Sequence, residues 1–126
     1  MTMIEIKELS KYFGKSKAIS NLNITIPEGE AASLWGSNGA GKTTLIRCLL
    51  GVIPFQGEIL IDGKSLRSND KEIKKLIGFV PQEISLHDNL SVEETINFYS
   101  QIKKTSFSSI GKWEEILSIR KFEKKL

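Results

Sequence analysis

A glycine-rich stretch from Gly36 to Thr44 constrains this chain more than any other part of its sequence. Its residues, Gly-Ser-Asn-Gly-Ala-Gly-Lys-Thr-Thr, match the phosphate-binding loop pattern of a glycine, four free positions and then Gly-Lys-Thr. Residues 31–35 before it are mostly apolar and predict a buried strand. Residues 44–50 after it contain good helix formers, and Gly51 is the expected helix end. The order of strand, glycine loop and helix predicts a site for a phosphate chain.

The residue types of this loop suit a bound nucleotide. Its three glycines let the backbone adopt conformations closed to other residues, and they bring amides close to an anion. The expected helix adds the positive end of its dipole. The Lys42 ammonium is expected to contact the β- and γ-phosphates, and the Thr43 hydroxyl is expected to be a magnesium ligand. We therefore expect nucleotide contacts from Gly36, Ser37, Asn38, Gly39, Ala40, Gly41, Lys42, Thr43 and Thr44.

Composition excludes several other classes of protein. The chain has 126 residues, of which 40% are hydrophobic and 26% are charged, as expected for one soluble globular domain. Its net charge of +3 is mild, so the lysine clusters predict solvated helix faces and no nucleic acid partner. The single cysteine, Cys48, excludes an internal disulfide, and its apolar surroundings indicate a buried residue, not a nucleophile. No apolar run approaches the roughly 20 residues that span a bilayer, and no secretion signal is present, so we expect a cytoplasmic chain.

The N-terminal part of the sequence reads as strands. Residues 3–9 and 18–26 alternate apolar and polar side chains, which predicts two antiparallel strands joined by a turn at residues 11–16. Residues 58–63 predict a strand that ends in an Asp-Gly turn, and residues 76–80 predict a further apolar strand stopped by a proline. A leading hairpin of this kind differs from small kinases and GTPases, which usually begin close to the phosphate loop.

The rest of the chain reads as helical. Residues 69–75 predict a short helix. Ser91 and Glu94 have the spacing of a capping box, and the helix that follows carries Val92, Ile96, Tyr99 and Ile102 on one face. A last helix is expected from residue 112 to about 124. We expect residues 1–88 to form a β subdomain with the phosphate-loop core, and residues 89–126 to begin a helical subdomain.

Several stretches, taken together and in order, resemble the N-terminal half of the nucleotide-binding ATPase subunit of ATP-binding-cassette (ABC) transporters. They are residues 9–14, 36–44, 57–63, 77–82 and 89–94. The resemblance covers essentially the whole chain. It implies an α/β fold of the P-loop NTPase type. This ABC-type half-domain would contain an N-terminal antiparallel β subdomain, a phosphate-loop strand–helix core and the start of the helical subdomain.

The resemblance also implies roles for residues outside the phosphate loop. Phe13 matches the aromatic residue that stacks on adenine, although Tyr12 is an alternative and an ordinary core role for Phe13 stays open. Gln82 matches the glutamine that reaches magnesium and the attacking water, in the loop that contacts the membrane partner. The implied catalytic residues are Lys42 and Gln82, and the implied metal ligands are Thr43 and Gln82. The sole histidine, His87, is expected to be a solvated loop residue.

The function implied is binding and hydrolysis of Mg²⁺-ATP coupled to transport. The implied partners are a transmembrane permease subunit, which would hold the chain at the inner face of the membrane, and a second ABC ATPase subunit. Residues 80–82 and 89–94 resemble the exporting branch. In the family the signature motif, the second magnesium carboxylate, the catalytic glutamate and the switch histidine would follow Leu126. The chain alone is therefore expected to lack turnover, and to bind ATP weakly or not at all.

Two other interpretations stay open at this point. One is a soluble ABC ATPase of translation or repair, and the other is a shortened, non-catalytic nucleotide-binding remnant. One residue departs from the family pattern, because Trp35 stands next to the phosphate loop where a smaller aliphatic residue is usual.

Overall fold

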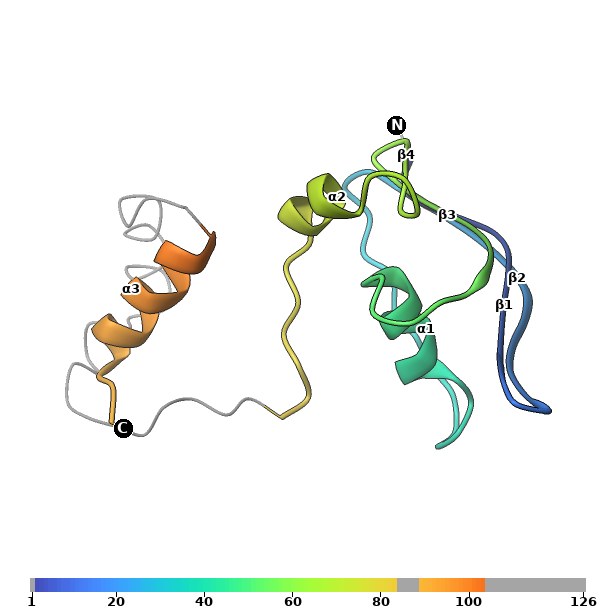
Figure 1. Ribbon diagram of the computed structural model, residues 1–126, viewed down its shortest axis with the longest axis horizontal. Helices are drawn as coiled ribbons and strands as arrows, with labels where there is room; N and C mark the ends of the chain where they lie inside the picture. The colour runs from blue at the N-terminus through green and yellow to red at the C-terminus, as the bar shows by residue number, and fades with distance from the viewer. Residues whose placement is uncertain (1, 84–88, 104–126) are drawn as a thin grey trace. The chain divides into compact units, whose positions relative to one another are not determined.

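The computed structural model describes residues 2–83 and 89–103, and it divides into two compact units, Met1–Gly78 and Phe79–Leu126. The first unit holds an antiparallel sheet of four strands in the order β2-β1-β3-β4 (Figure 1). The strands are β1 Thr2–Phe13, β2 Ser16–Pro27, β3 Gln56–Ile61 and β4 Lys64–Ser65. Its helices are α1 Lys42–Leu49 and α2 Asp70–Leu76, and the second unit holds α3 Val92–Lys103.

The β1–β2 hairpin is confirmed, but its turn is tighter than the sequence indicates. The ladder continues to the pair Phe13 and Ser16, so both aromatics at this end of β1 belong to the strand and not to the turn. Gly14 takes φ +57, a conformation that glycine adopts without steric penalty, and this allows the chain to reverse directly after Phe13.

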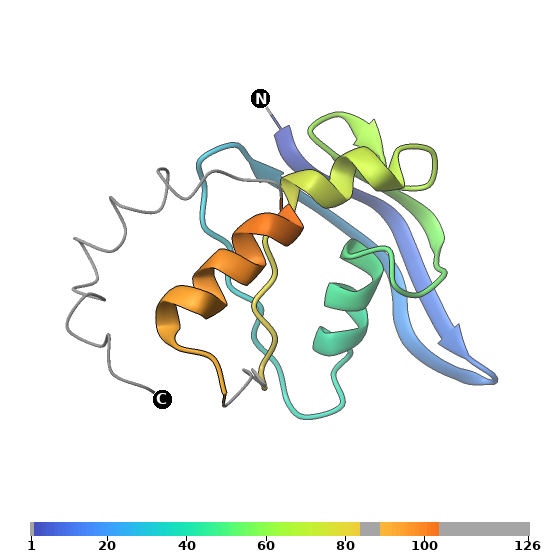
Figure 2. The same cartoon turned by 60° about the vertical axis from the view of Figure 1, so that its left-hand side comes forward.

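The core lies between the sheet and the two helices of the first unit. Figure 2 shows α1 against one face of the sheet, and its inward residues Leu45 and Cys48 are buried there. The other buried apolar residues are Ile6, Leu9, Ile59, Ile61, Leu66 and Ile73. Each fully buried aliphatic side chain stabilises the fold by about 1.5–3 kcal/mol. The core is therefore built by the sheet, α1 and α2 together, and it fixes the position of α1.

Helix α1 ends where the sequence predicts. Gly51 has φ +65, and its amide donates to the Cys48 carbonyl, while the Val52 amide donates to the Arg47 carbonyl. This pair of bonds is the Schellman motif, in which a left-handed glycine terminates the helix. The predicted helix end at Gly51 is thus confirmed.

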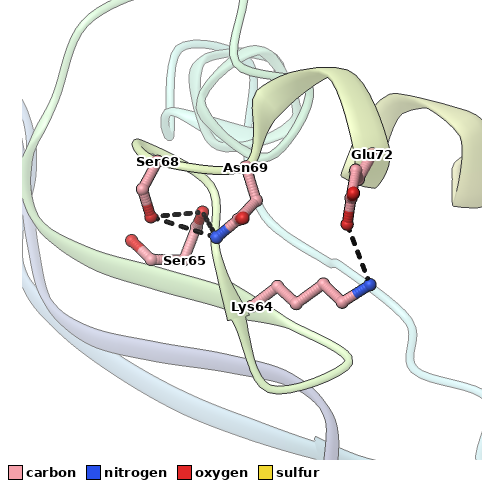
Figure 3. Close-up of polar contacts among 5 residues, drawn as sticks. All are labelled: Lys64, Ser65, Ser68, Asn69 and Glu72. Atoms are coloured by element: carbon pink, nitrogen blue, oxygen red, sulfur yellow. Dashed lines mark hydrogen bonds and ion pairs between the residues drawn. The ribbon is translucent and has the colours of Figure 1, made fainter.

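A short polar connection leads from β4 to α2 (Figure 3). The side-chain nitrogen of Asn69, Nδ2, donates to the Ser65 carbonyl at 3.3 Å and to the Ser68 hydroxyl at 3.0 Å. Lys64 Nζ pairs with the Glu72 carboxylate at 3.1 Å. Both side chains of this ion pair are largely exposed, so it contributes about 0–1 kcal/mol. The connection lets Leu66 and Ile73 enter the same core.

Two strand predictions are wrong. The predicted strand at residues 31–35 has no regular secondary structure. In the predicted strand at residues 76–80, Leu76 is the last residue of α2 and residues 77–80 are irregular. Most of their apolar side chains are exposed, with Trp35 at 89%, Val80 at 76% and Phe79 at 53%, whereas Ile77 packs against the core. A strand with an apolar sequence needs hydrogen-bonded neighbour strands, and neither segment belongs to the sheet that residues 2–83 and 89–103 form.

The second unit confirms the predicted capping box. The Glu94 carboxylate accepts a hydrogen bond from the Ser91 amide at 2.8 Å, and the Ser91 hydroxyl accepts one from the Glu94 amide at 3.2 Å. The predicted last helix at residues 112–124 and His87 lie outside the described residues. Within the described part of the chain, no helix has both the length and the apolar character needed to cross a bilayer.

The start of α3 is expected to loosen in acid. The Ser91 amide, and then the Ser91 side chain, lower the pKa of Glu94. The ionised Glu94 carboxylate stabilises the helix start fully at pH values above the ordinary pKa of a glutamate. This stabilisation is lost as the pH falls below that value and through the lowered pKa of Glu94. Amide resonances of α3 followed by NMR against pH should show this change. Glu94→Gln should remove the change and Glu93→Gln should keep it. A response in Glu94→Gln as large as that of the parent would contradict this assignment.

Candidate functional site

The Lys42 side chain folds back over the glycine loop that precedes it. Its Nζ donates to the Gly36 carbonyl at 2.7 Å and to the Ser37 carbonyl at 2.8 Å. The Ala40 amide donates to the Ser37 carbonyl at 3.2 Å, which closes a turn inside the loop. These bonds hold one ammonium group directly above the backbone of residues 36–41.

The N-terminus of α1 is open to an anion. Gly41 caps the helix with φ +89, no side chain bonds to the first-turn amides, and the first turn carries no acidic residue. The first amides of a helix have no carbonyl partner within it, and they carry the positive end of the helix dipole. Because no side chain among the described residues caps this end and its first turn carries no acidic residue, it has the features of a phosphate site.

The phosphate loop contacts the β1–β2 hairpin directly. A Cβ placed on Gly41 would lie 2.6 Å from the Ala18 carbonyl oxygen and 3.6 Å from the Ile19 side chain. Only glycine permits this approach. The hairpin and the phosphate loop therefore form one continuous surface within the first unit.

Phe13 lies near the tip of that hairpin and is half exposed, at 51%. The Lys11 ammonium sits 4.9 Å from the centre of its ring and donates to the Pro54 carbonyl, in the loop after α1, at 2.7 Å. Such a cation–π contact contributes about 0.5–1 kcal/mol at an exposed site. One ammonium group thus keeps the Phe13 ring on the side of the hairpin where the chain leaves α1.

Lys11 is the contact that the sequence interpretation missed. The sequence predicts a turn for residues 11–16, whereas residues two apart on a strand share a face. That spacing from Phe13 was the available signal. The contact with Pro54 joins segments 43 residues apart, and nothing in the local sequence indicated it.

Gln82 and Cys48 lie outside the phosphate loop. Gln82 is exposed and belongs to the second unit. Cys48 is fully buried in the core, and burial raises the pKa of its thiol. A raised pKa disfavours the reactive thiolate, in keeping with a packing role.

The donor set at the loop fits magnesium held together with a phosphate chain. Thr43 is exposed in the first turn of α1, and magnesium takes one or two protein oxygens alongside water and phosphate oxygens. Within the described residues no group of three or more His, Cys, Asp or Glu side chains could hold a metal ion. A hydroxyl beside an anion site is thus the form of metal binding that these residues can support.

The comparison with known families agrees with this geometry. The profile of the ABC transporter family matches residues 19–126. The chain belongs to the ABC transporter family. The α/β half-domain class is also confirmed, because a solved ATP-binding subunit of an ABC transporter superposes on 99% of the chain with a TM-score of 0.84. That neighbour is 22% identical, and the chain covers 54% of its length.

Curated relatives of the ABC family are similar to this chain in sequence. The bacitracin transport ATP-binding protein BcrA of Bacillus licheniformis is 35% identical over 130 residues, which span 99% of this chain and 42% of BcrA. The xylose import ATP-binding protein XylG of Yersinia pseudotuberculosis is 38% identical over 99 residues, 75% of this chain and 19% of XylG. The chain thus spans less than half the length of either relative.

Proposed function

We propose that this chain binds Mg²⁺-ATP as the nucleotide-binding part of an ABC transporter ATPase subunit. The observation that carries the proposal is the Lys42 ammonium, which bonds to the glycine loop beside the start of α1, where Gly41 offers no capping side chain. An ammonium group, free backbone amides and a helix dipole all favour a multiply charged phosphate chain. The family match to residues 19–126 supports the same ligand.

Each part of the site would act on a different part of the nucleotide. The amides of residues 36–44 would surround the β-phosphate, and Lys42 would bridge the β- and γ-phosphates. Phe13 would stack on the adenine ring. Bound Mg²⁺, held by Thr43 and Gln82, would neutralise charge on the phosphate oxygens.

Turnover and transport belong to a larger assembly in this proposal. Lys42 and Gln82 would orient the phosphate and the attacking water, but neither is a general base, so we propose that this chain alone has no sustained turnover. A transmembrane permease and a second ATPase subunit would be its partners, which would place it at the inner face of the membrane. One relative is named for bacitracin transport and another for xylose import, so the relatives do not agree on a direction of transport. Export by this chain's transporter therefore stays a prediction.

The alternative functions make different predictions. A soluble ABC ATPase of translation or repair would bind the same nucleotide but no permease. A non-catalytic remnant would bind ATP without any assembly that turns it over. Co-purification with a membrane subunit favours transport, and its failure alongside intact ATP binding favours one of the alternatives.

Calorimetry with two ligands tests the assignment of the site. The sequence predicts weak or no binding by the chain alone. Because Lys42 already contacts the loop beside the start of α1, we expect instead that Mg²⁺-ATP and Mg²⁺-tripolyphosphate both bind, and that ATP binds more tightly. Phe13→Ala should weaken ATP about tenfold, the scale of one base–aromatic stack, and leave tripolyphosphate unchanged. Tyr12→Ala is the matched neighbour and should change neither affinity.

Each result of this titration has a distinct meaning. If Tyr12→Ala no longer binds Mg²⁺-ATP more tightly than Mg²⁺-tripolyphosphate, and Phe13→Ala still does, then Tyr12 is the residue that stacks on adenine. Failure of both ligands to bind the parent chain would refute the phosphate site itself.

A further inference from the structure

Four register shifts interrupt the β1–β2 pairing, and the two that contain Glu8 and Asn21 change which side chains face the core. Ile6 and Leu9 are three residues apart on β1, yet both are buried on the same side, with Glu8 between them at φ +51. Strict alternation would put residues three apart on opposite faces. The extra residue at Glu8 therefore shifts the alternation of the whole distal half of β1.

The bulge at Asn21 shifts the alternation of side chains on β2 in the same way. Ile19 and Leu22 are three residues apart and both pack against the core, with Asn21 between them at φ +45. The two extra residues offset each other, so that Lys11 pairs with Ile19, and a further register shift follows between Lys11 and Tyr12. Bulges next to functional sites commonly redirect side chains in this way.

The shift at Glu8 decides which aromatic residue shares a face of β1 with Lys11. Counting in twos from Leu9 places Lys11 and Phe13 on the core side of β1, whereas counting from Ile6 without a bulge would place Tyr12 there. The observed contacts agree with the first pattern, because the Lys11 ammonium meets both the Phe13 ring and the Pro54 carbonyl. The bulge at Glu8 thus puts Phe13, and not Tyr12, on the face of β1 that carries Lys11.

Two side chains hold these bulges in place. The Asn23 Oδ1 accepts a hydrogen bond from the Glu8 amide at 2.9 Å, and its Nδ2 donates to the Asn21 carbonyl at 3.2 Å. The Ser10 hydroxyl accepts from the Asn21 amide at 2.9 Å. Positive φ at a residue other than glycine costs about 1–3 kcal/mol, so it persists only where neighbouring groups hold it. Asn23 contacts both strained residues at once.

We propose that Asn23, supported by Ser10, is a positioning residue of the nucleotide site: it fixes the bulges that present Phe13 to the base of a nucleotide held by the phosphate loop. The proposal rests on the proposed function, since it needs ATP to bind at residues 36–44. Both hydrogen bonds of the Asn23 side chain go to hairpin residues, Glu8 and Asn21. Its effect therefore passes through the conformation of the hairpin.

The test is the ratio of Mg²⁺-ATP to Mg²⁺-tripolyphosphate affinity, measured by calorimetry on the full chain. Asn23→Ala should lower this ratio about threefold or more, toward the value of Phe13→Ala, and leave tripolyphosphate affinity within twofold of the parent. Asn23→Asp keeps an acceptor for the Glu8 amide and should restore part of the ratio. Thr25→Ala changes an exposed residue two positions along β2 and is the matched control.

The outcomes separate this inference from the function beneath it. An unchanged ratio in Asn23→Ala, with the ratio lost in Phe13→Ala, overturns the positioning role and leaves ATP binding intact. If neither Mg²⁺-ATP nor Mg²⁺-tripolyphosphate binds to the parent chain, both the proposed function and the positioning role of Asn23 are overturned. If Asn23→Ala fails to fold, Ser10→Ala loses only the Asn21 bond, and an unchanged ratio in that variant counts against the proposal.

Discussion

Replacing Lys42 with alanine is expected to weaken Mg²⁺-ATP binding about 100-fold while the chain stays folded. A hydrogen bond to a charged group contributes about 1.5–3 kcal/mol, and Lys42 is placed to make such bonds to two phosphates, so a loss of about 3 kcal/mol follows. The two carbonyls that Lys42 contacts, on Gly36 and Ser37, belong to exposed residues. Water can replace the ammonium there, so stability should change little.

Calorimetry with Mg²⁺-ATP and with Mg²⁺-tripolyphosphate measures this effect, and circular dichroism checks the fold. Both ligands should lose affinity equally in Lys42→Ala, because the lysine acts on phosphates and not on the base. Lys64→Ala is a matched control, since it removes an ammonium paired with Glu72 in the β4–α2 connection. An Lys42→Ala variant that binds both ligands as tightly as Lys64→Ala would remove the basis for the proposed site.

Features with short-range causes could be predicted from this sequence. The β1–β2 hairpin, the end of α1 at Gly51 and the Ser91–Glu94 capping box each depend on residues within a few positions of one another. Their signals are turn glycines, alternation and cap spacing, all visible in one window of sequence. The phosphate loop belongs to the same group, because its glycines, lysine and following helix are consecutive.

Features with long-range causes could not be predicted. Residues 31–35 and 77–80 are apolar enough for buried strands, but a strand forms through its partners, and neither segment belongs to the sheet that the described residues form. The bulges at Glu8 and Asn21 depend on Asn23, whose side chain reaches across the hairpin. Neither residue with positive φ is a glycine, so composition gave no signal for these bulges.

The same long-range geometry leads to the largest expected loss of stability, in Gly57→Ala. Gly57 has φ +89, and an added Cβ would lie 2.5 Å from the carbonyl oxygens of both Lys7 and Glu8 on β1. A left-handed conformation costs alanine about 1–2 kcal/mol by itself. The clash adds to this, because relieving it means moving β1 away from β3 in the middle of the sheet. We expect a total loss of at least about 3 kcal/mol, a large part of a stability of roughly 5–15 kcal/mol.

Gly63→Ala is a control that separates the cost of the left-handed backbone conformation from the cost of the steric clash. Gly63 has φ +70 in the turn after β3, and an added Cβ would meet no atom within 4 Å, so only the conformational cost of about 1–2 kcal/mol remains. Urea denaturation followed by circular dichroism should therefore show a much lower midpoint for Gly57→Ala than for Gly63→Ala, or no cooperative transition in Gly57→Ala. Equal midpoints would mean that β1 can move at Glu8 without loss. The bulge would then be too soft to position Phe13, so this stability measurement also bears on the role proposed for Asn23.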